Sequence, residues 1–187
     1  MYPSKVSEKR GGSERVLVEV KARCADTERM RRKVLGIGSK YVGTFHQIDT
    51  YFNSPRGYLK LRETEGAPSL LIYYDREALA GPKESNILIT EVSDPSGLKG
   101  ILKSSLGIRV TVEKSRQIFH LKGTEIHLDS VKGLGSFVEF ERLTKKEPGA
   151  LKRSRRRVRL LMKRLGITKQ DLLRGSYSDL LGGKAYV

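Results

Sequence analysis

The chain has 187 residues, of which 37 are Lys or Arg and 21 are Asp or Glu, giving a formal net charge of +16. Hydrophobic residues make up 37% of the chain, enough for a buried core, and no run approaches the roughly 20 consecutive apolar residues of a membrane-spanning helix. The only cysteine, Cys24, excludes an intramolecular disulfide and a cysteine-based zinc cluster. These features predict a soluble, cytoplasmic protein with an anionic partner and no membrane partner.

Residues 1–14 are polar and without periodicity, which predicts a flexible tail before a single domain spanning residues 15–187. Residues 16–23 then alternate, with Val16, Val18 and Val20 on one face and Glu19 and Lys21 on the other, which predicts a strand. A helix should follow, beginning at residue 26 or 27 and ending at residue 36.

The rest of the chain predicts seven more strands and further helices. The strands are expected at about 41–53, 58–65, 69–77, 86–93, 108–120, 124–131 and 136–143. Helices are expected at 96–106 and about 148–165, with another helix start at Thr168. This order is typical of an α+β fold built on antiparallel strands, and a barrel is compatible with it.

The predicted helix at 148–165 lies in the most basic part of the chain. From Lys145 to Arg164 there are ten bases and one acid, Glu147. Leu151, Val158, Leu161 and Leu165 recur at helical spacing, which predicts an amphipathic helix docked on the domain. Its basic face is interpreted as solvated; a surface for nucleic acid or anionic lipid is the alternative.

Charged residues also recur at every second position of the predicted strands, which places them on one face. The groups are Glu19/Lys21/Arg23, Lys60/Arg62, Tyr74/Arg76, Lys114/Arg116, His127/Asp129 and Glu139/Glu141. A closed barrel would bring these faces together inside, where unpaired charges cost several kcal/mol, so the interior must be wet or hold a charged ligand. Converging bases suit phosphates, and carboxylates suit a hard divalent cation, so the pattern predicts a metal–polyphosphate or metal–nucleotide site.

Single residues are less informative. Asp49 and Tyr51 share a strand face with Gln47 and could point inward, and functional and structural interpretations are equally weighted. His127 is interpreted as a phosphate contact or a supporting residue rather than a zinc ligand.

Several segments together resemble the CYTH domain, the triphosphate tunnel metalloenzyme superfamily. Residues 18–23, VEVKAR, resemble its opening E-x-E-x-K strand, and QIDTYF at 47–52, YLKLR at 58–62 and LIYYDR at 71–76 follow in family order. Lys114-x-Arg116, HLD at 127–129, GLGSFVEFE at 133–141 and SYSDLL at 176–181 complete the set. The DTYF, LKLR, LIYYDR and HLD elements are most similar to the class IV adenylyl cyclase branch.

The resemblance implies a closed antiparallel eight-stranded β-barrel, the triphosphate tunnel, with flanking helices and Mg²⁺ or Mn²⁺ as cofactor. It implies that the triphosphate is bound by Lys21, Arg23, Lys60, Arg62, Arg76, Lys114 and Arg116. Among these, Lys21, Arg62, Lys114 and Arg116 are the candidate catalytic residues. The metal ligands it implies are Glu19, Asp129, Glu139 and Glu141.

One position departs from the family pattern. Leu17 occupies the place of the first Glu of E-x-E-x-K, and a leucine cannot ligate a hard cation. The departure leaves the fold and the phosphate contacts in place, whereas it puts one metal position and the reaction in doubt.

Three functions follow in order of preference. The first is an adenylyl cyclase that converts ATP to cyclic AMP and pyrophosphate, and the second is a triphosphatase acting on tripolyphosphate or thiamine triphosphate. The third is a non-catalytic protein that binds nucleotides or polyphosphate. A nucleic acid is a less favoured partner than a small triphosphate, and a homodimer is left open.

Overall fold

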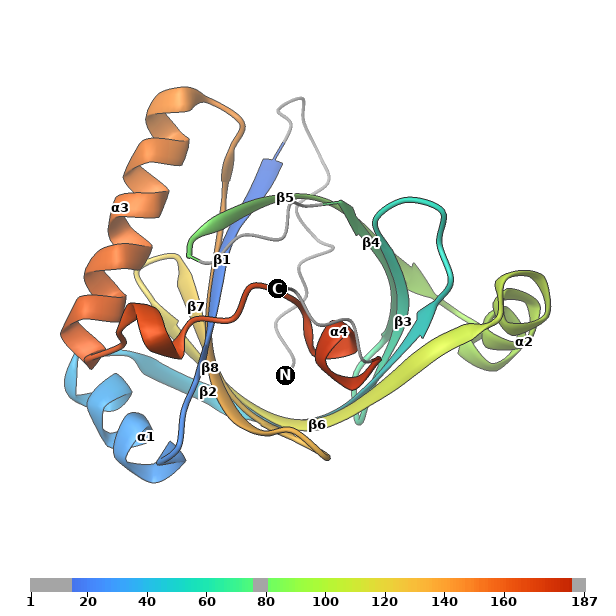
Figure 1. Ribbon diagram of the computed structural model, residues 1–187, viewed down its shortest axis with the longest axis horizontal. Helices are drawn as coiled ribbons and strands as arrows, with labels where there is room; N and C mark the ends of the chain where they lie inside the picture. Colours follow the sequence, from blue (N-terminus) through green and yellow to red (C-terminus); the bar gives the residue numbers. More distant parts are fainter. Residues whose placement is uncertain (1–14, 76–80, 183–187) are drawn as a thin grey trace.

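The computed structural model describes residues 15–75 and 81–182, and eight strands in it close into an antiparallel barrel (Figure 1). The strands are β1 (Arg15–Arg23), β2 (Lys40–Phe52), β3 (Tyr58–Thr64), β4 (Ser69–Asp75), β5 (Lys83–Val92), β6 (Ile108–Leu121), β7 (Thr124–Val131) and β8 (Gly135–Lys145). The helices are α1 (Thr27–Gly36), α2 (Pro95–Leu106), α3 (Pro148–Leu165), the 3₁₀ helix η2 (Lys169–Asp171) and α4 (Tyr177–Leu181). The expected α+β barrel is therefore confirmed, while the tail predicted at 1–14 and Arg76 lie outside the described residues.

The barrel closes because β1 pairs with two strands. Around the ring the order is β1-β5-β4-β3-β2-β6-β7-β8, and β1 pairs antiparallel with both β5 and β8. β5 begins at Lys83, before the expected residue 86, because Lys83 pairs with Glu19 at the closure. The helix start predicted at Thr168 leads only into η2, where Thr168 and Asp171 form a capping box.

The main hydrophobic core lies outside the barrel, between its wall and two helices. Val18, Val20, Ile126, Leu128 and Phe140 from β1, β7 and β8 are buried on this face. From the helix side, Val34 of α1 and Val158, Leu161 and Leu165 of α3 pack in the same cluster. Figure 1 shows α1 and α3 on one side of the ring and α2 on the other. Because this core covers the outer face of these strands, their inner faces are free to carry charge.

Helix α3 has the amphipathic character that its sequence predicts. Its apolar stripe is buried, whereas Lys152, Arg153, Arg156, Arg159, Lys163 and Arg164 are exposed. The helix ends at Gly166, whose φ of 77° is left-handed and favours glycine. Of the helices in the described part of the chain, none has the length and apolarity to span a bilayer.

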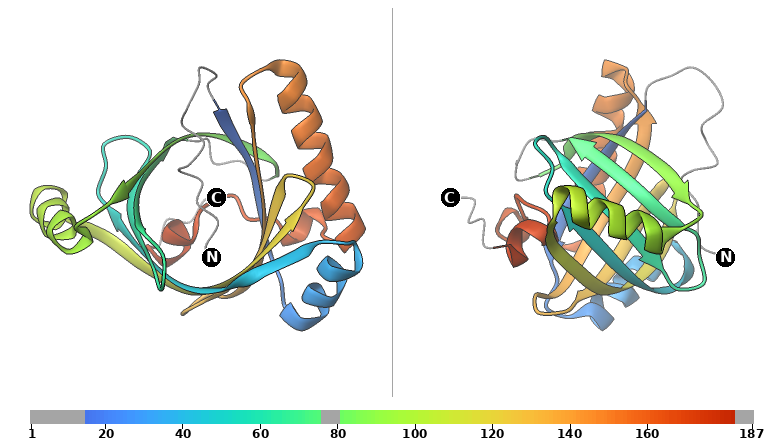
Figure 2. Two further views of the ribbon diagram at one scale, coloured as in Figure 1. Left: turned by 180° about the vertical axis from the view of Figure 1, so that it is seen from behind. Right: turned by 90° about the vertical axis from the view of Figure 1, so that its right-hand side faces the viewer.

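The C-terminal segment covers one end of the barrel. The Leu173 amide donates to the Lys21 carbonyl at 2.9 Å, which attaches the segment to β1. Helix α4 then lies at that end, as the side view in Figure 2 shows. It is held there by buried Asp179, whose carboxylate accepts hydrogen bonds from Tyr58 (2.9 Å) and Arg109 (2.8 Å). The segment thus places Tyr177 against the barrel interior.

Candidate functional site

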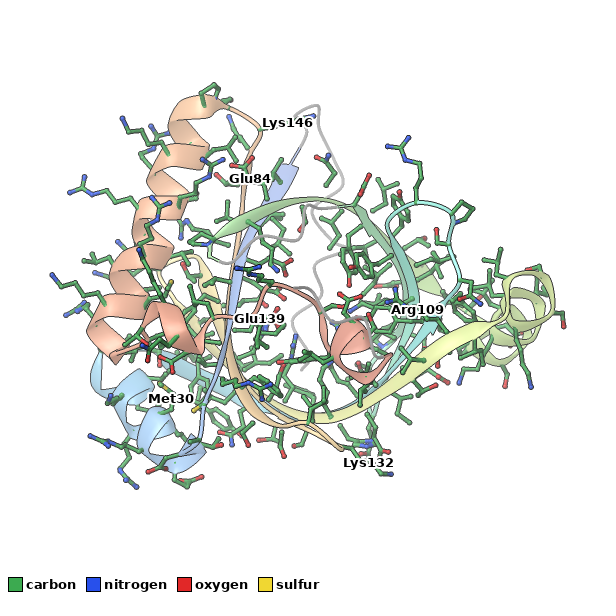
Figure 3. All side chains as sticks on the ribbon, viewed as in Figure 1. Met30, Glu84, Arg109, Lys132, Glu139 and Lys146 are labelled. Carbon is green, nitrogen blue, oxygen red and sulfur yellow. The ribbon has the colours of Figure 1, made fainter. Side chains whose placement is uncertain are left out.

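A pocket inside the barrel collects charged side chains from most of the strands. Its cations come from β1, β3 and β6 and are Lys21, Lys60, Arg62, Lys114 and Arg116. Its carboxylates come from β1, β2, β7 and β8 and are Glu19, Asp49, Glu125, Glu139 and Glu141. In Figure 3, Glu139 lies within the ring of strands, whereas Lys132 lies at its outer edge. The period-two alternation of the strands therefore produces a charged interior.

Asp49 is the centre of one charge network. Its carboxylate, 1% exposed, accepts hydrogen bonds from Lys60 (3.0 Å), Lys114 (2.8 Å) and both Nε and Nη2 of Arg62 (2.7 and 2.8 Å). Burial alone would raise the pKa of Asp49, but the charges of Arg62, Lys114 and Lys60 outweigh it and hold the pKa well below its usual value. One carboxylate thus brings three cations together from two strands.

The two lysines of this network have lowered pKa values. Burial lowers the pKa of Lys114 to about 7, although the neighbouring Asp49 opposes the change. Burial and the charge of Arg62 lower the pKa of Lys60 to about 8, again against Asp49. Both lysines therefore carry more positive charge than a single carboxylate can stabilise, a condition that an anionic ligand would relieve.

Arg116 is the centre of a second network. It donates to both oxygens of Asp129 (2.7 and 2.6 Å) and to Glu139 (2.6 Å), which also pairs with Lys21 at 2.5 Å. The hydroxyl of Tyr177 donates to Asp129 at 2.7 Å. Burial would raise the pKa of Asp129, but Arg116 lowers it to about 2. Asp129 therefore holds Arg116 in place and is fully buried behind it, away from the pocket lining.

Two overlapping sets of ligand atoms could hold a metal ion. One consists of Glu19, Glu139 and Glu141 and the other of Glu125, His127 and Glu141, and in each set the atoms lie within 4.8 Å of one another. The first set contains only carboxylate oxygens, the donors that Mg²⁺ and Mn²⁺ prefer. The residues present therefore fit a hard divalent cation.

The structure brings together most of the residues that the sequence suggested, and leaves three apart. Lys21, Lys60, Arg62, Lys114 and Arg116 line the pocket with Glu19, Glu139 and Glu141. Arg23 lies at the exposed end of β1, its guanidinium 5.7 Å from the centroid of the Phe137 ring. Asp129 is separated from the metal-ligand sets by its contacts with Arg116. Arg76 falls in the part of the chain that is not described.

Sequence reasoning missed two residues and left one undecided. Glu125 has the same strand parity as His127 and Asp129, so extending that pattern by two residues would have found it. Tyr177 carried no local signal, because only the path of the C-terminal segment places it beneath Lys21, 4.1 Å from the ring centroid. Asp49 was the undecided residue, and its parity with Tyr51 was the available signal.

A closed antiparallel barrel with paired cationic and acidic faces inside characterises one class of protein. A family model described as the CYTH domain matches residues 17–177, and the chain belongs to that family. A protein of Methanocaldococcus jannaschii named "Putative adenylate cyclase MJ0240" is 26% identical over 180 residues, covering 88% of this chain and 98% of that relative.

Solved structures show the same fold. The PH1012 protein of Pyrococcus horikoshii OT3 is 27% identical and superimposes with a TM-score of 0.78, covering 88% of this chain and 98% of its own. A Vibrio parahaemolyticus protein described as "a putative adenylate cyclase" is 23% identical, with a TM-score of 0.77 and coverage of 92% and 99%. This second likeness concerns the fold alone.

Proposed function

We propose that this protein is a metal-dependent enzyme that holds a triphosphate in the barrel and acts as an adenylyl cyclase. The observation that carries the proposal is the convergence of buried cations from β1, β3 and β6 on one pocket whose other walls carry carboxylates. Family membership and the name of the Methanocaldococcus jannaschii relative support the same activity.

The cations would bind the phosphates of ATP. Arg62 and Arg116 present planar forks that match phosphate oxygens, and Lys21, Lys60 and Lys114 add point charges. Asp49 and Asp129 keep the two arginines oriented before the ligand enters, so little reorganisation accompanies binding. Glu19, Glu139 and Glu141 would hold Mg²⁺ or Mn²⁺, which neutralises phosphate charge when bound.

In the cyclase reaction, the ribose 3′-oxygen forms a bond to the α-phosphorus. The bond from that phosphorus to the bridging oxygen breaks, its electron pair leaves with pyrophosphate, and the hydroxyl proton is released. The negative charge that develops on the leaving pyrophosphate is stabilised by the fixed cations, Arg116 and Lys114 among them.

An apolar stretch of the same pocket favours a nucleotide over bare tripolyphosphate. Leu17, Leu70, Ile72, Ile87 and Ile89 line the pocket on β1, β4 and β5. A flat aromatic base can bury its faces against such side chains, whereas an inorganic polyphosphate gains nothing from them. Leu17, which removes a carboxylate from the metal side, extends this apolar wall.

The test is incubation of the protein with ATP and, separately, tripolyphosphate, with Mg²⁺ or Mn²⁺, followed by chromatography of every product. We expect cyclic AMP and pyrophosphate from ATP, lost in Lys114→Met and retained in the surface control Arg156→Gln. Orthophosphate with a diphosphate product would instead identify a triphosphatase. Tight binding of ATP without any product would contradict an enzymatic role and identify a binding protein.

A further inference from the structure

His127 is a buried histidine that lies against the tunnel carboxylates. Its side chain is 1% exposed, and its Nδ1 has no hydrogen-bond partner among the described residues. This nitrogen is 3.6 Å from an oxygen of Glu139 and 3.8 Å from an oxygen of Glu141. A buried polar atom without a partner is costly, so the orphaned nitrogen indicates a missing ligand.

The opposite side of the ring is already oriented. Nε2 of His127 lies 3.0 Å from Oε2 of Glu125, a neighbour on the same strand face. A histidine that binds a metal through one nitrogen commonly donates its other N–H to a carboxylate, which fixes the ring and its tautomer. With Nε2–H donating to Glu125, Nδ1 keeps its lone pair and faces Glu139 and Glu141.

The strand register explains why a cation would lie on this side. Glu141 pairs with Glu19 on β1 and with Glu125 on β7, so three carboxylates form one row across the barrel wall. The row on one side of it contains Leu17 opposite Leu143, which offer no ligand atoms. The row on the other side contains Glu139 opposite His127. Ligands beyond the carboxylate row therefore exist only toward His127.

We propose that Nδ1 of His127 is a ligand of the tunnel cation, together with Glu141, Glu139 and Glu19, and that Glu125 orients the imidazole. The inference rests on the proposed metal-dependent function and adds the chemical class of the ion. A mixed nitrogen and oxygen donor set favours a divalent transition metal, such as Mn²⁺, over Mg²⁺, which prefers oxygen ligands. The ligand that Leu17 cannot supply on β1 is thus supplied from β7.

The experiment uses the full-length protein and Mn²⁺ alone, without nucleotide. Binding is followed by loss of the free Mn²⁺ electron paramagnetic resonance signal, and pulsed measurements detect coupling to a coordinated ¹⁴N nucleus. We expect ¹⁴N coupling in the unchanged protein, replaced by a ¹⁵N pattern when histidine is labelled with ¹⁵N. Bound Mn²⁺ without nitrogen coupling, or no binding of Mn²⁺, would overturn the assignment.

Variants locate the nitrogen. His127→Ala should abolish the coupling and weaken Mn²⁺ binding by about 10- to 100-fold, while Mg²⁺ binding, measured by competition, changes by less than about threefold. The matched control His46→Ala changes a histidine that is 45% exposed and pairs with Glu113, and it should change neither quantity. Coupling that survives in folded His127→Ala would contradict the proposal. The isotope experiment needs no variant, so a His127→Ala protein that fails to fold does not prevent the test.

The outcome is separable from that of the proposed reaction. Nitrogen coupling in a protein that forms no product from ATP would refute the cyclase and leave the ligand assignment standing. Formation of cyclic AMP by a protein whose bound Mn²⁺ shows no nitrogen coupling would refute only the ligand assignment.

Discussion

Asp49 shows how one side chain can hold a phosphate-binding site ready for its ligand. Its carboxylate lies among three cationic groups at 2.7–3.0 Å, and it is almost completely buried. A buried carboxylate of this kind compensates the repulsion between the cations, as a phosphate would do on binding. We infer that Asp49 is a positioning residue for Lys60, Arg62 and Lys114.

Replacing this carboxylate should destabilise the protein in a way that a triphosphate corrects. Asp49→Asn keeps the shape but leaves buried cations uncompensated, so we expect the free energy of unfolding to fall by about 3 kcal/mol. Tripolyphosphate should restore part of this loss, and its stabilising effect should be larger in the variant than in the unchanged protein. Urea unfolding followed by circular dichroism, with and without tripolyphosphate, measures both quantities.

The control is Glu113→Gln, which removes an exposed carboxylate that pairs with Lys132 and His46. Exposed pairs contribute little, so its free energy of unfolding should change by less than about 1 kcal/mol. If Asp49→Asn behaved like this control, the role assigned to Asp49 would be wrong.

The lowered pKa values of two lysines predict an unusual pH dependence of stability. Burial lowers the pKa of Lys114 from 10.5 to about 7, so above pH 7 the folded state binds fewer protons here than the unfolded state. Stability rises with pH wherever the unfolded state binds more protons. The free energy of unfolding should therefore increase by about 1–2 kcal/mol between pH 7 and pH 9, and Lys60, with a pKa of about 8, acts in the same direction.

Chemical denaturation at several pH values in the absence of phosphate measures this slope. Lys114→Met removes one of the titrating groups and should make the slope shallower. A free energy of unfolding that falls between pH 7 and pH 9 in the unchanged protein would contradict the prediction.

At the scale of elements, α3 is stabilised by its buried face and opposed by its exposed one. Val158, Leu161 and Leu165 pack against the barrel, and each large apolar side chain buried in this way contributes about 1.5–3 kcal/mol. Its exposed face carries like charges at helical spacing, which repel one another. The exception is Arg155, which pairs with Glu84 of β5 and connects the helix to the barrel.

Reversing one exposed charge should stabilise this helix. Arg156 lies near Lys152, Arg153 and Arg159 along the helix surface, so Arg156→Glu should raise the free energy of unfolding by about 0.5–1 kcal/mol and leave tripolyphosphate binding unchanged. The matched change Arg155→Glu places like charges at Glu84 and should lower it. Urea unfolding and isothermal titration calorimetry provide the two measurements, and weaker tripolyphosphate binding by Arg156→Glu would show that α3 takes part in the site.

At the scale of the whole molecule, the site depends on closure of the ring. Its cations and carboxylates come from β1, β2, β3, β6, β7 and β8, and α4 adds Tyr177 from the other end of the chain. Because these elements meet only in the folded barrel, a ligand of the pocket binds the native state and not the unfolded chain. Ligand binding should thus stabilise the entire fold.

The size of this effect follows from mass action. Tripolyphosphate at a hundredfold excess over its Kd adds about 2.7 kcal/mol, which for a chain of this length raises the Tm by about 5–10 °C. Thermal unfolding followed by circular dichroism measures the shift, and sulfate at equal ionic strength serves as the control. A Tm that responds equally to sulfate would argue against a specific triphosphate site.

The sequence by itself determined the strands and the face on which their charges lie. A strand alternates its side chains between two faces, so pairs such as Lys60/Arg62 and Lys114/Arg116 had to share a face, whatever the fold. The amphipathic stripe of α3 and the family motifs were equally local signals.

Only the tertiary structure decided which charges meet. Asp49 and Lys114 are 65 residues apart, and Asp129 and Tyr177 are 48 apart, so no local pattern could assign these partners. The same register moved Asp129 behind Arg116 and placed His127 beside Glu139 and Glu141. Ion pairing depends on distance in space, and in this protein strand order and barrel closure set that distance.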